Sequence, residues 1–299
     1  MARSVMVTGA TSGVGLATAL RLAGAGYEVF ATARSAEKAE KLDALASERG
    51  VALRTVLLDV ADPGSCQEAV DRIARQTDGG PWGLVNNAGI PLAGAVEDVD
   101  DEAARRLLEV NVLGPARLAR LVLPAMRRRG EGRIVNISSL GGRVTAPGMG
   151  WYCGGKAALG SLNHALRMEA APSGVRVVLI HGAGYASAIW ERAADDLADL
   201  AASGRSPHAE IYRGIEEALR ATAQLPGPEP IVRAVHRALT AEHPKACYVV
   251  GAKTRLGGAA DLLGPYRLTD HLKRVALGIG EPARNRLVEY AARRWCTPW

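Results

Sequence analysis

Short apolar segments alternate with longer amphipathic segments along the first 180 residues of the chain. The apolar segments have the length of buried strands, and the segments between them repeat apolar residues at helical spacing. Strands are predicted at residues 5–8, 28–33, 51–58, 82–86, 133–137 and 175–180, and helices at residues 16–23, 36–47, 100–129 and 151–171 and after Pro63. Strands joined by helices of this length require parallel crossovers, so we expect an α/β fold with an open, doubly wound parallel sheet.

The alternation of strands and helices breaks after residue 180. Helices are predicted at residues 189–202, 207–223 and 231–241, and a seventh strand at residues 246–250. The turn-rich run LPGPEP at residues 225–230 is too short to separate two domains. We therefore expect a single Rossmann-like domain over residues 1–299, with about seven strands, a substrate lid at about 184–228 and a helical tail at about 255–299.

The composition is that of an ordinary globular protein. Of the 299 residues, 48% are hydrophobic and 23% are charged, which argues against extended disorder. The four cysteines are Cys66, Cys153, Cys247 and Cys296. Their spacing fits neither a disulfide framework nor a metal site and suits a reducing compartment. No apolar run reaches the ~18 residues of a membrane span and no leader precedes the first strand, so we expect a cytoplasmic protein without membrane association.

The formal net charge of +6 does not indicate a nucleic-acid partner. The arginines at 127–129 and 293–294 lack the stacking aromatics of such a surface, and the first group suits the C-terminal end of a helix. The basic, amphipathic segment 266–277 has three interpretations: a membrane surface, a partner subunit or burial against its own domain. We favour the third.

A glycine-rich turn lies between the first predicted strand and the first predicted helix. It reads Thr8-Gly9-Ala10-Thr11-Ser12-Gly13-Val14-Gly15. Glycine permits positive φ and close approach of the backbone to a ligand, and a helix N-terminus favours phosphate. This context predicts a dinucleotide site. Its candidate residues are Gly9, Thr11, Ser12, Gly13, Val14 and Gly15.

The end of the second predicted strand bears on the choice of cofactor. An acidic residue there would bond the ribose 2′-hydroxyl of NAD(H) and repel a 2′-phosphate. This chain has Ala33 and then Arg34, whose planar guanidinium can hold a phosphate. The sequence therefore predicts NADP(H).

Further motifs follow at regular intervals along the chain. They are Asn86-Asn87-Ala88-Gly89 after the fourth strand, Asn111 in the long helix, Ser138-Ser139 after the fifth strand, and the YxxxK pair Tyr152 and Lys156. With the TGxxxGxG turn, their order and spacing over residues 5–190 resemble the short-chain dehydrogenase/reductase family.

This resemblance implies a catalytic group of Asn111, Ser139, Tyr152 and Lys156. Ser139 is preferred to Ser138 because it lies thirteen residues before Tyr152, as in the family. Residues i and i+4 share a helix face, so the Lys156 ammonium can favour the phenolate of Tyr152, which then exchanges a proton with the substrate oxygen. Ser139 donates a hydrogen bond to the same oxygen. Lys156 also binds the nicotinamide ribose, and Asn111 holds a water that relays protons.

The resemblance also implies further contacts with the cofactor. Asp59 and Val60 flank the adenine, and Tyr185 and Ser187 bind the nicotinamide carboxamide. The remaining expected contacts are Asn87, Ala88, Gly89, Tyr152 and Lys156. Taken singly, Tyr152 could be a surface tyrosine, Ser139 a loop cap and Asn111 a helix kink, but their joint spacing favours function.

The sequence departs from the family pattern after the sixth strand. Gly182 and Ala183 replace a Pro-Gly pair, Ser187 stands where threonine is usual, and two glycines, Gly154 and Gly155, lie inside the YxxxK helix. Two explanations are open: drift in a working reductase, which we favour, or redox-neutral chemistry with bound NADP(H), such as cyclisation, dehydration or epimerisation. In the second case His181 would be an added acid or base; otherwise it is hydrogen-bonded structure.

Apolar residues near the expected cleft indicate the substrate class. The candidate substrate contacts are Leu140, Met149, Trp151, Ile189 and Trp190, each of which could equally be lid packing. Together they favour a ketone or secondary alcohol on a hydrophobic, steroid-like, lipid or secondary-metabolite molecule. A non-enzymatic NADPH-sensing protein is disfavoured because the proton-transfer residues are retained. The family resemblance implies a homodimer or homotetramer formed through the helices at 100–129 and 151–171.

Overall fold

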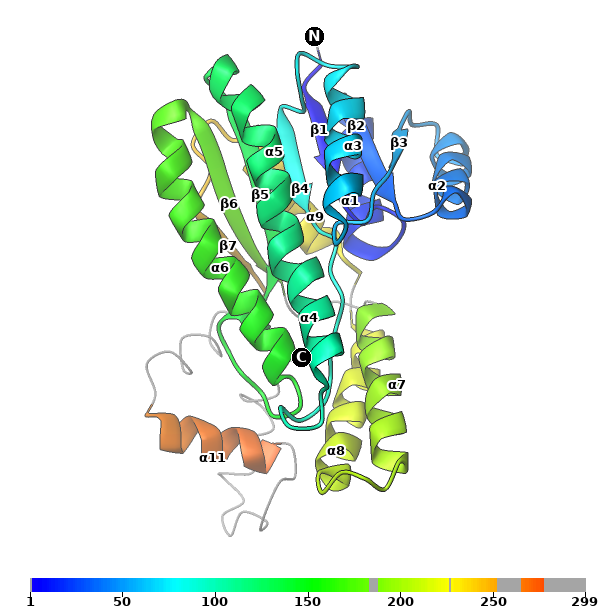
Figure 1. The fold of residues 1–299 in the computed structure, drawn as a ribbon, viewed down its shortest axis with the longest axis vertical. Coiled ribbons are helices and arrows are strands. Elements are labelled where there is room, and N and C mark those ends of the chain that lie inside the picture. The colour runs from blue at the N-terminus through cyan, green and yellow to red at the C-terminus, as the bar shows by residue number, and fades with distance from the viewer. Residues whose placement is uncertain (1, 183–187, 226, 252–264, 277–299) are drawn as a thin grey trace.

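Seven parallel strands form one sheet in the order β3-β2-β1-β4-β5-β6-β7 (Figure 1). This computed structural model describes residues 2–182, 188–225, 227–251 and 265–276. The strands are β1 (Ser4–Val7), β2 (Glu28–Ala33), β3 (Arg54–Leu57), β4 (Gly83–Asn86), β5 (Gly132–Ser139), β6 (Val175–Gly182) and β7 (Cys247–Val250). The predicted α/β fold is confirmed. Strand order reverses between β1 and β4, and open α/β sheets bind ligands at such a point.

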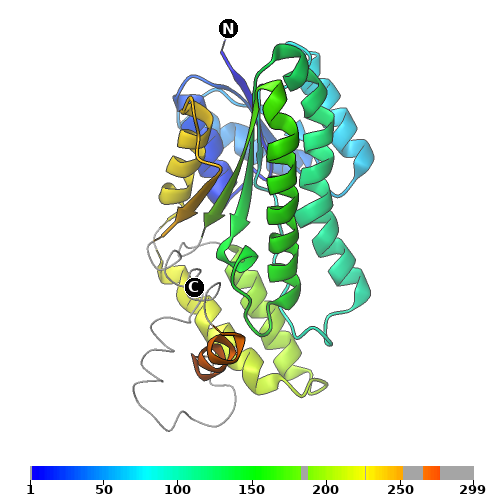
Figure 2. The ribbon, with the colours of Figure 1, turned by 90° about the vertical axis from the view of Figure 1, so that its left-hand side faces the viewer.

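Helices cover both faces of the sheet (Figure 2). They are α1 (Gly13–Gly24), α2 (Ala36–Glu48), α3 (Pro63–Ala74), α4 (Asp101–Leu108), α5 (Gly114–Arg129), α6 (Gly150–Ala170) and α9 (Glu229–Thr240). Side chains alternate across each strand. Val5 and Val7 of β1 therefore pack with α1 and α9, whereas Met6 packs with α3 and α5 on the opposite face. Burial on both faces explains the mostly apolar sequences of the central strands β1, β2 and β4.

The predicted helix at 100–129 is interrupted by a π-helical turn. Asp100 begins α4, because its carboxylate accepts a hydrogen bond from the Ala103 amide at 2.7 Å. The turn η1 (Glu109–Leu113) separates α4 from α5 and contains Asn111. A π turn inserts one extra residue into a helix and is frequent at functional sites.

A pair of helices lies beyond the C-terminal ends of the strands (Figure 1). These are α7 (Ala188–Ala202) and α8 (Ala209–Arg220), within the predicted lid. The Tyr212 hydroxyl of α8 donates to the Asp98 carboxylate and accepts from the Ala95 amide at 3.0 Å. Ser206 also donates to Asp98, at 2.5 Å. These contacts attach the helix pair to the loop that precedes α4.

Part of the predicted C-terminal tail is helical. Helix α11 (Tyr266–Ala276) lies within it, and the rest of the tail is outside the described residues. Across the described segments, none of the helices combines the length and apolar character needed to cross a bilayer.

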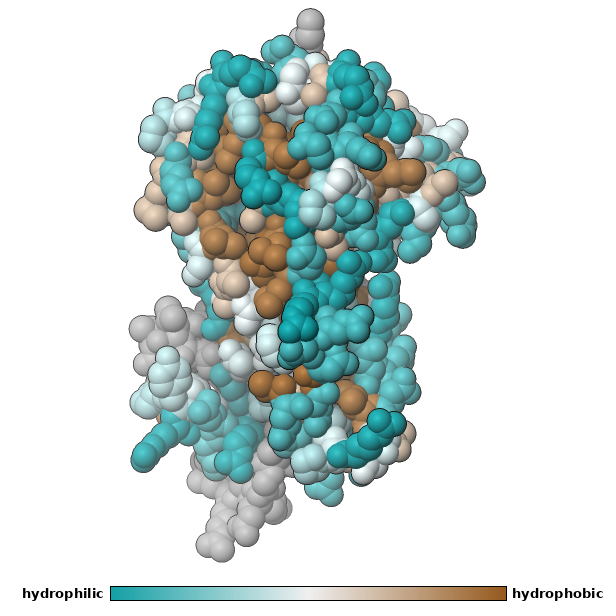
Figure 3. Space-filling view, viewed as in Figure 1, coloured by the Kyte–Doolittle hydropathy of each residue, from teal (hydrophilic) through white to brown (hydrophobic). Residues whose placement is uncertain are grey.

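Apolar side chains are exposed on the face formed by α5 and α6. Figure 3 shows hydrophobic atoms gathered over these two helices. Leu162 and Met168 of α6 are 45% and 62% exposed, and Leu113 at the start of α5 is 48% exposed. This face is the one on which the sequence predicts subunit contacts.

Gly154 has no steric reason to be glycine. It is exposed on α6, and an added Cβ would meet nothing within 4 Å, whereas one on Gly155 would contact Leu107 at 3.5 Å. We expect Gly154→Ala to raise the free energy of unfolding by about 0.5–1 kcal/mol, because glycine in a helix costs that much relative to alanine. Urea unfolding of the two proteins measures the change. A loss of stability would contradict the open environment of Gly154.

Candidate active site

The glycine-rich turn after β1 is joined to the loop after β4. The Asn87 side-chain amide donates to the carbonyls of Thr8 at 2.9 Å and Gly9 at 3.2 Å. The Thr8 hydroxyl accepts from the amides of Asn87 and Ala88, both at 2.9 Å. A Cβ on Gly15 would lie 2.2 Å from the Gly9 carbonyl oxygen, so only glycine fits there. Gly9 itself has φ +63°, which also favours glycine.

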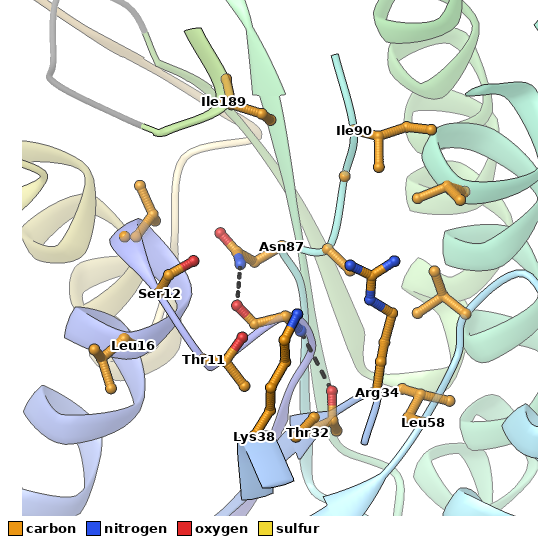
Figure 4. A pocket seen from close by; sticks show the side chains of 18 of the residues that line it. Thr11, Ser12, Leu16, Thr32, Arg34, Lys38, Leu58, Asn87, Ile90 and Ile189 are labelled. Atoms are coloured by element: carbon orange, nitrogen blue, oxygen red, sulfur yellow. Dashed lines mark hydrogen bonds between the residues drawn. The ribbon is translucent and has the colours of Figure 1, made fainter. Parts of the chain in front are cut away.

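A cavity of about 530 Å³ extends from this turn along the C-terminal ends of the strands (Figure 4). Most of the predicted cofactor residues line it: Gly9, Thr11, Ser12, Gly13, Val14, Arg34, Asp59, Val60, Asn87, Ala88, Gly89, Tyr152 and Lys156. Tyr185 and Ser187 lie outside the described residues. Gly15 packs behind the wall of the cavity.

One end of the cavity is basic. Figure 4 shows the side chains of Arg34 and Lys38 there, beside Thr11. Lys41 also lines this end and pairs with Glu37 at 2.5 Å. Lys38 was not among the predicted residues; its signal was a lysine in the first helical turn after the candidate phosphate-binding arginine.

Asp59 forms part of the same wall. Its carboxylate pairs with Arg106 at 3.3 Å and accepts from the Ala61 amide at 2.9 Å. Burial alone would raise the pKa of Asp59, but these two interactions hold the pKa below its ordinary value. Asp59 is therefore a fixed anion, already neutralised by its own arginine.

Tyr152 and Lys156 lie one turn apart on α6 and both line the cavity. The Lys156 ammonium donates to the Ile137 carbonyl at 3.1 Å and lies 5.9 Å from the centre of the Tyr152 ring. Trp190 of α7 packs edge-on against that ring at 5.7 Å between centroids. Burial lowers the pKa of Lys156 to about 8. Lys156 can therefore gain or lose a proton near neutral pH.

The lowered pKa of Lys156 predicts a pH-dependent stability. Between the folded pKa of about 8 and the ordinary 10.5, the unfolded chain binds more protons at this residue, so stability rises with pH through that window. We expect a contribution of about 2 kcal/mol between pH 7.5 and pH 9.5, which Lys156→Met removes. Urea unfolding of both proteins at the two pH values measures it. If the stability of the two proteins depended equally on pH, the pKa of Lys156 would not be lowered by burial, and the prediction would be wrong.

Asn111 links the π turn to the loop after β4. Its side-chain amide accepts from the Ile90 amide and donates to the Ile90 carbonyl, both at 2.9 Å. A Cβ on Gly89 would lie 3.2 Å from Asn111 Oδ1 and 3.6 Å from Lys156 Nζ. Asn111 thus lies behind the cavity wall, close to Lys156 and separated from it by Gly89.

Ser139 is buried at the end of β5 and does not itself line the cavity. Its hydroxyl oxygen accepts from the Gly141 amide at 3.1 Å, which leaves the hydroxyl proton to be donated. Its carbonyl accepts from Nδ1 of His181 at 2.8 Å. Burial lowers the pKa of His181, which is absent from the cavity lining. This geometry favours the structural interpretation of His181.

A chain of buried asparagines holds together the elements that carry the predicted catalytic residues. The Asn86 amide on β4 donates to Asn136 on β5 at 2.8 Å, and Asn136 donates to Asn163 on α6 at 2.9 Å. The helix that carries Tyr152 is thereby fixed to the strand that carries Ser139. Neither Asn136 nor Asn163 was predicted; for Asn136 the signal was a polar residue inside a mostly apolar strand.

The predicted substrate residues occupy different surroundings. Ile189 lines the cavity, and Figure 4 shows it on the side opposite Lys38. Met149 is fully buried and Trp190 nearly so, in one apolar cluster with α7 and α8. Leu140 is buried, and Trp151 donates from its indole to the Val96 carbonyl at 3.4 Å. Of the five, the described geometry brings Ile189 alone into the cavity.

The residues present fit a phosphate-bearing dinucleotide. The turn brings bare backbone to a helix N-terminus where a side chain on Gly15 would not fit, and unpaired cations line one end of the cavity. Tyr152 and Lys156 lie on a separate wall, on α6. This is the arrangement expected if the adenosine end meets the cations and the reactive end meets Tyr152.

Comparison with known sequences identifies similar proteins. Residues 3–198 match the family model for short chain dehydrogenase. The uncharacterized oxidoreductase YbbO of Escherichia coli K12 is 31% identical over 272 residues, which cover 91% of this chain and 94% of that protein. Estradiol 17-beta-dehydrogenase 2 of Rattus norvegicus is 30% identical over 286 residues, covering 90% and 74%.

Solved structures with the same fold include examples with each nicotinamide cofactor. A short-chain dehydrogenase from Streptomyces avermitilis has a TM-score of 0.75 at 30% identity, covering 93% of this chain and 98% of that one. A variant of the actinorhodin polyketide ketoreductase with NADPH has a TM-score of 0.70 at 28% identity, covering 85% and 97%. NAD+-bound xylitol dehydrogenase has a TM-score of 0.72 at 27% identity, covering 83% and 96%.

Proposed function

The chain belongs to the short chain dehydrogenase family and is an NAD(P)-dependent oxidoreductase, and from that premise we propose that it uses NADP(H) to reduce a ketone, or oxidise a secondary alcohol, on a hydrophobic substrate. The observation that carries this proposal is the shared cavity. It runs from the glycine-rich turn to Tyr152 and Lys156, so one bound dinucleotide can reach both.

The chain's own residues supply the proton chemistry. Bound nicotinamide supplies or accepts the hydride. Tyr152 protonates the carbonyl oxygen during reduction, or removes the alcohol proton during oxidation. Lys156, with a pKa near 8, stabilises the phenolate and replaces its proton. The hydroxyl of Ser139, oriented by Gly141, donates to the substrate oxygen once the substrate is bound, and Asn111 keeps the loop after β4 against η1.

The preference for NADP(H) is supported by the basic end of the cavity. Arg34 and Lys38 line it, and Ala33 stands where an acidic residue would select NAD(H). The carboxylates that line this end, Glu37 and Asp59, are ion-paired with Lys41 and Arg106, which leaves Arg34 and Lys38 for a 2′-phosphate.

The hydrophobic substrate class is supported by the apolar lid. Ile189 and Ile90 line the cavity, and α7 and α8 pack over Met149 and Tyr152. The rat relative is named for estradiol, and a similar structure is named as a polyketide ketoreductase. These features favour a steroid-like, lipid or secondary-metabolite ketone over a phosphorylated sugar.

We propose a homodimer or homotetramer. The exposed Leu113, Leu162 and Met168 on α5, α6 and the adjoining turn supply the apolar surface that subunit contacts require.

The test is a panel of hydrophobic ketones with NADPH. Loss of NADPH absorbance in step with formation of the alcohol supports the proposal. Product formation with unchanged NADPH would instead show redox-neutral chemistry, and no turnover over steroid, acyl and polycyclic ketones would contradict the substrate class. Light scattering of the purified protein measures the subunit number, and a monomer at micromolar concentration would contradict the assembly.

A further inference from the structure

Arg192 is the single lysine or arginine in α7, and it lines the same cavity as Thr11, Ser12 and Gly13. Its side chain is exposed, and among the described residues no carboxylate lies within ion-pair distance of it. Asp196, one turn further along α7, is near enough for Arg192 to lower the pKa of its carboxyl, which burial raises overall. Arg192 therefore brings an uncommitted positive charge from the lid into the cavity.

The geometry of α7 directs this charge toward the glycine-rich turn. Ile189 is in the first turn of α7, and Figure 4 shows it above Ser12 and Asn87. Arg192 follows three residues later, on the same helix face. Side chains on a helix lean toward its N-terminus, so the guanidinium of Arg192 is directed back toward Ile189 and the cavity.

The glycine-rich turn at residues 8–15 is the part of the cavity that has no cationic side chain of its own. Lys41 is paired with Glu37 and Arg106 with Asp59, and Lys156 donates to a carbonyl beside Tyr152. Arg34 and Lys38 lie at the β2–α2 end, where the ribose 2′-position is expected. Residues 8–15 contain no charged side chain, so the turn offers a pyrophosphate its amides, its hydroxyls and the α1 dipole alone.

We propose that Arg192 binds the pyrophosphate of the dinucleotide from the lid side, opposite the glycine-rich turn; this inference rests on the proposed nicotinamide-dependent function. A guanidinium can bind two phosphate oxygens at once. Because Trp190 on the same helix packs against Tyr152, this contact also ties the helix that covers the catalytic tyrosine to the cofactor. Cofactor binding and the placement of α7 are thus linked through one residue.

The test compares binding of NADPH and NADH, which share a pyrophosphate but differ at the 2′-position. We expect Arg192→Gln to weaken both by the same factor, about 10- to 100-fold, because a charge-assisted contact common to both is lost. Arg192→Lys keeps the charge and should recover part of the loss. The matched control is Arg205→Gln, an exposed arginine between α7 and α8 that does not line the cavity. Titration calorimetry without substrate gives each Kd.

The outcomes separate this inference from the proposed function. Equal losses for both dinucleotides in Arg192→Gln, with an unchanged Arg205→Gln, support the pyrophosphate contact. A loss confined to NADPH would place Arg192 at the 2′-phosphate and overturn the inference, as would unchanged affinity for both. Wild-type protein that binds neither dinucleotide would overturn the proposed function itself. Matching thermal unfolding of the variants excludes misfolding as the cause of a loss.

Discussion

Tyr152→Phe is expected to lower kcat for ketone reduction by about 10³-fold and to leave the Kd of NADPH nearly unchanged. Phenylalanine retains the ring that packs against Trp190 but lacks the hydroxyl that exchanges the proton. The glycine-rich turn and the basic end of the cavity are untouched, so the dinucleotide keeps those contacts. Steady-state turnover and calorimetric binding measure the two effects separately.

A matched tyrosine far from the cofactor cavity provides the control. Tyr248 on β7 accepts from the Lys245 amide at 3.3 Å and does not line that cavity. Tyr248→Phe should therefore turn over at the wild-type rate. If Tyr152→Phe also kept the wild-type rate, proton transfer would have to come from another group and the mechanism would be wrong. A large loss of NADPH affinity in Tyr152→Phe would mean that the hydroxyl acts mainly in binding.

Arg34→Ala combined with Lys38→Ala is expected to raise the Kd of NADPH by about 100-fold and to change the Kd of NADH little. Each cation can donate a charge-assisted hydrogen bond to a 2′-phosphate, and NADH has no such group. The rise in the Kd of NADPH is not expected to be larger, because both side chains are exposed to solvent, which weakens their interaction with a phosphate. The ratio of the two dissociation constants, measured for both proteins, is the quantity to compare.

Arg49, the C-cap of α2, is the matched control for this double variant. It is exposed, outside the cavity lining and at the opposite end of α2 from Lys38, so Arg49→Ala removes a positive charge without removing a cavity contact. It should leave the ratio unchanged. Equal weakening of NADPH and NADH by the double variant would contradict the assignment of Arg34 and Lys38 to the 2′-phosphate.

The sheet could be predicted because its strands are buried on both faces. β1, β4 and β6 are mostly apolar, and each is followed by a turn or motif that the sequence singles out. β3 is shorter than its predicted span of 51–58, because only Arg54–Leu57 pair with β2. The π turn was not predicted, because residues 100–129 were read as one continuous helix and the only trace of the extra residue is a shift of about 100° in the apolar pattern near Glu109.

The cofactor site was more predictable than the substrate site. Gly15 is required by a contact with the Gly9 carbonyl, a local constraint that leaves a readable pattern of glycines. Lys38 is marked in the sequence only by its position in the first helical turn after Arg34, and Arg192 reaches the cavity through tertiary placement that no local motif marks. For apolar residues such as Met149 and Trp190, the sequence does not distinguish contact with substrate from packing within the protein. In this structure both pack in the apolar cluster with α7 and α8. Their contact with substrate stays a prediction.

The π turn at Glu109–Leu113 fixes the number of residues between α4 and α5 more strictly than it fixes which residues they are. Removing one residue there would restore ordinary helical pitch and rotate α4 against α5 by about 100°. Leu107 would leave the cluster beneath α8, and the amide of Asn111 would lose Ile90. A one-residue deletion between Asp100 and Gly114 would displace both contacts, because it changes the helical register between α4 and α5. An engineered insertion or circular permutation of this enzyme therefore has to keep the number of residues between Asp100 and Gly114 unchanged.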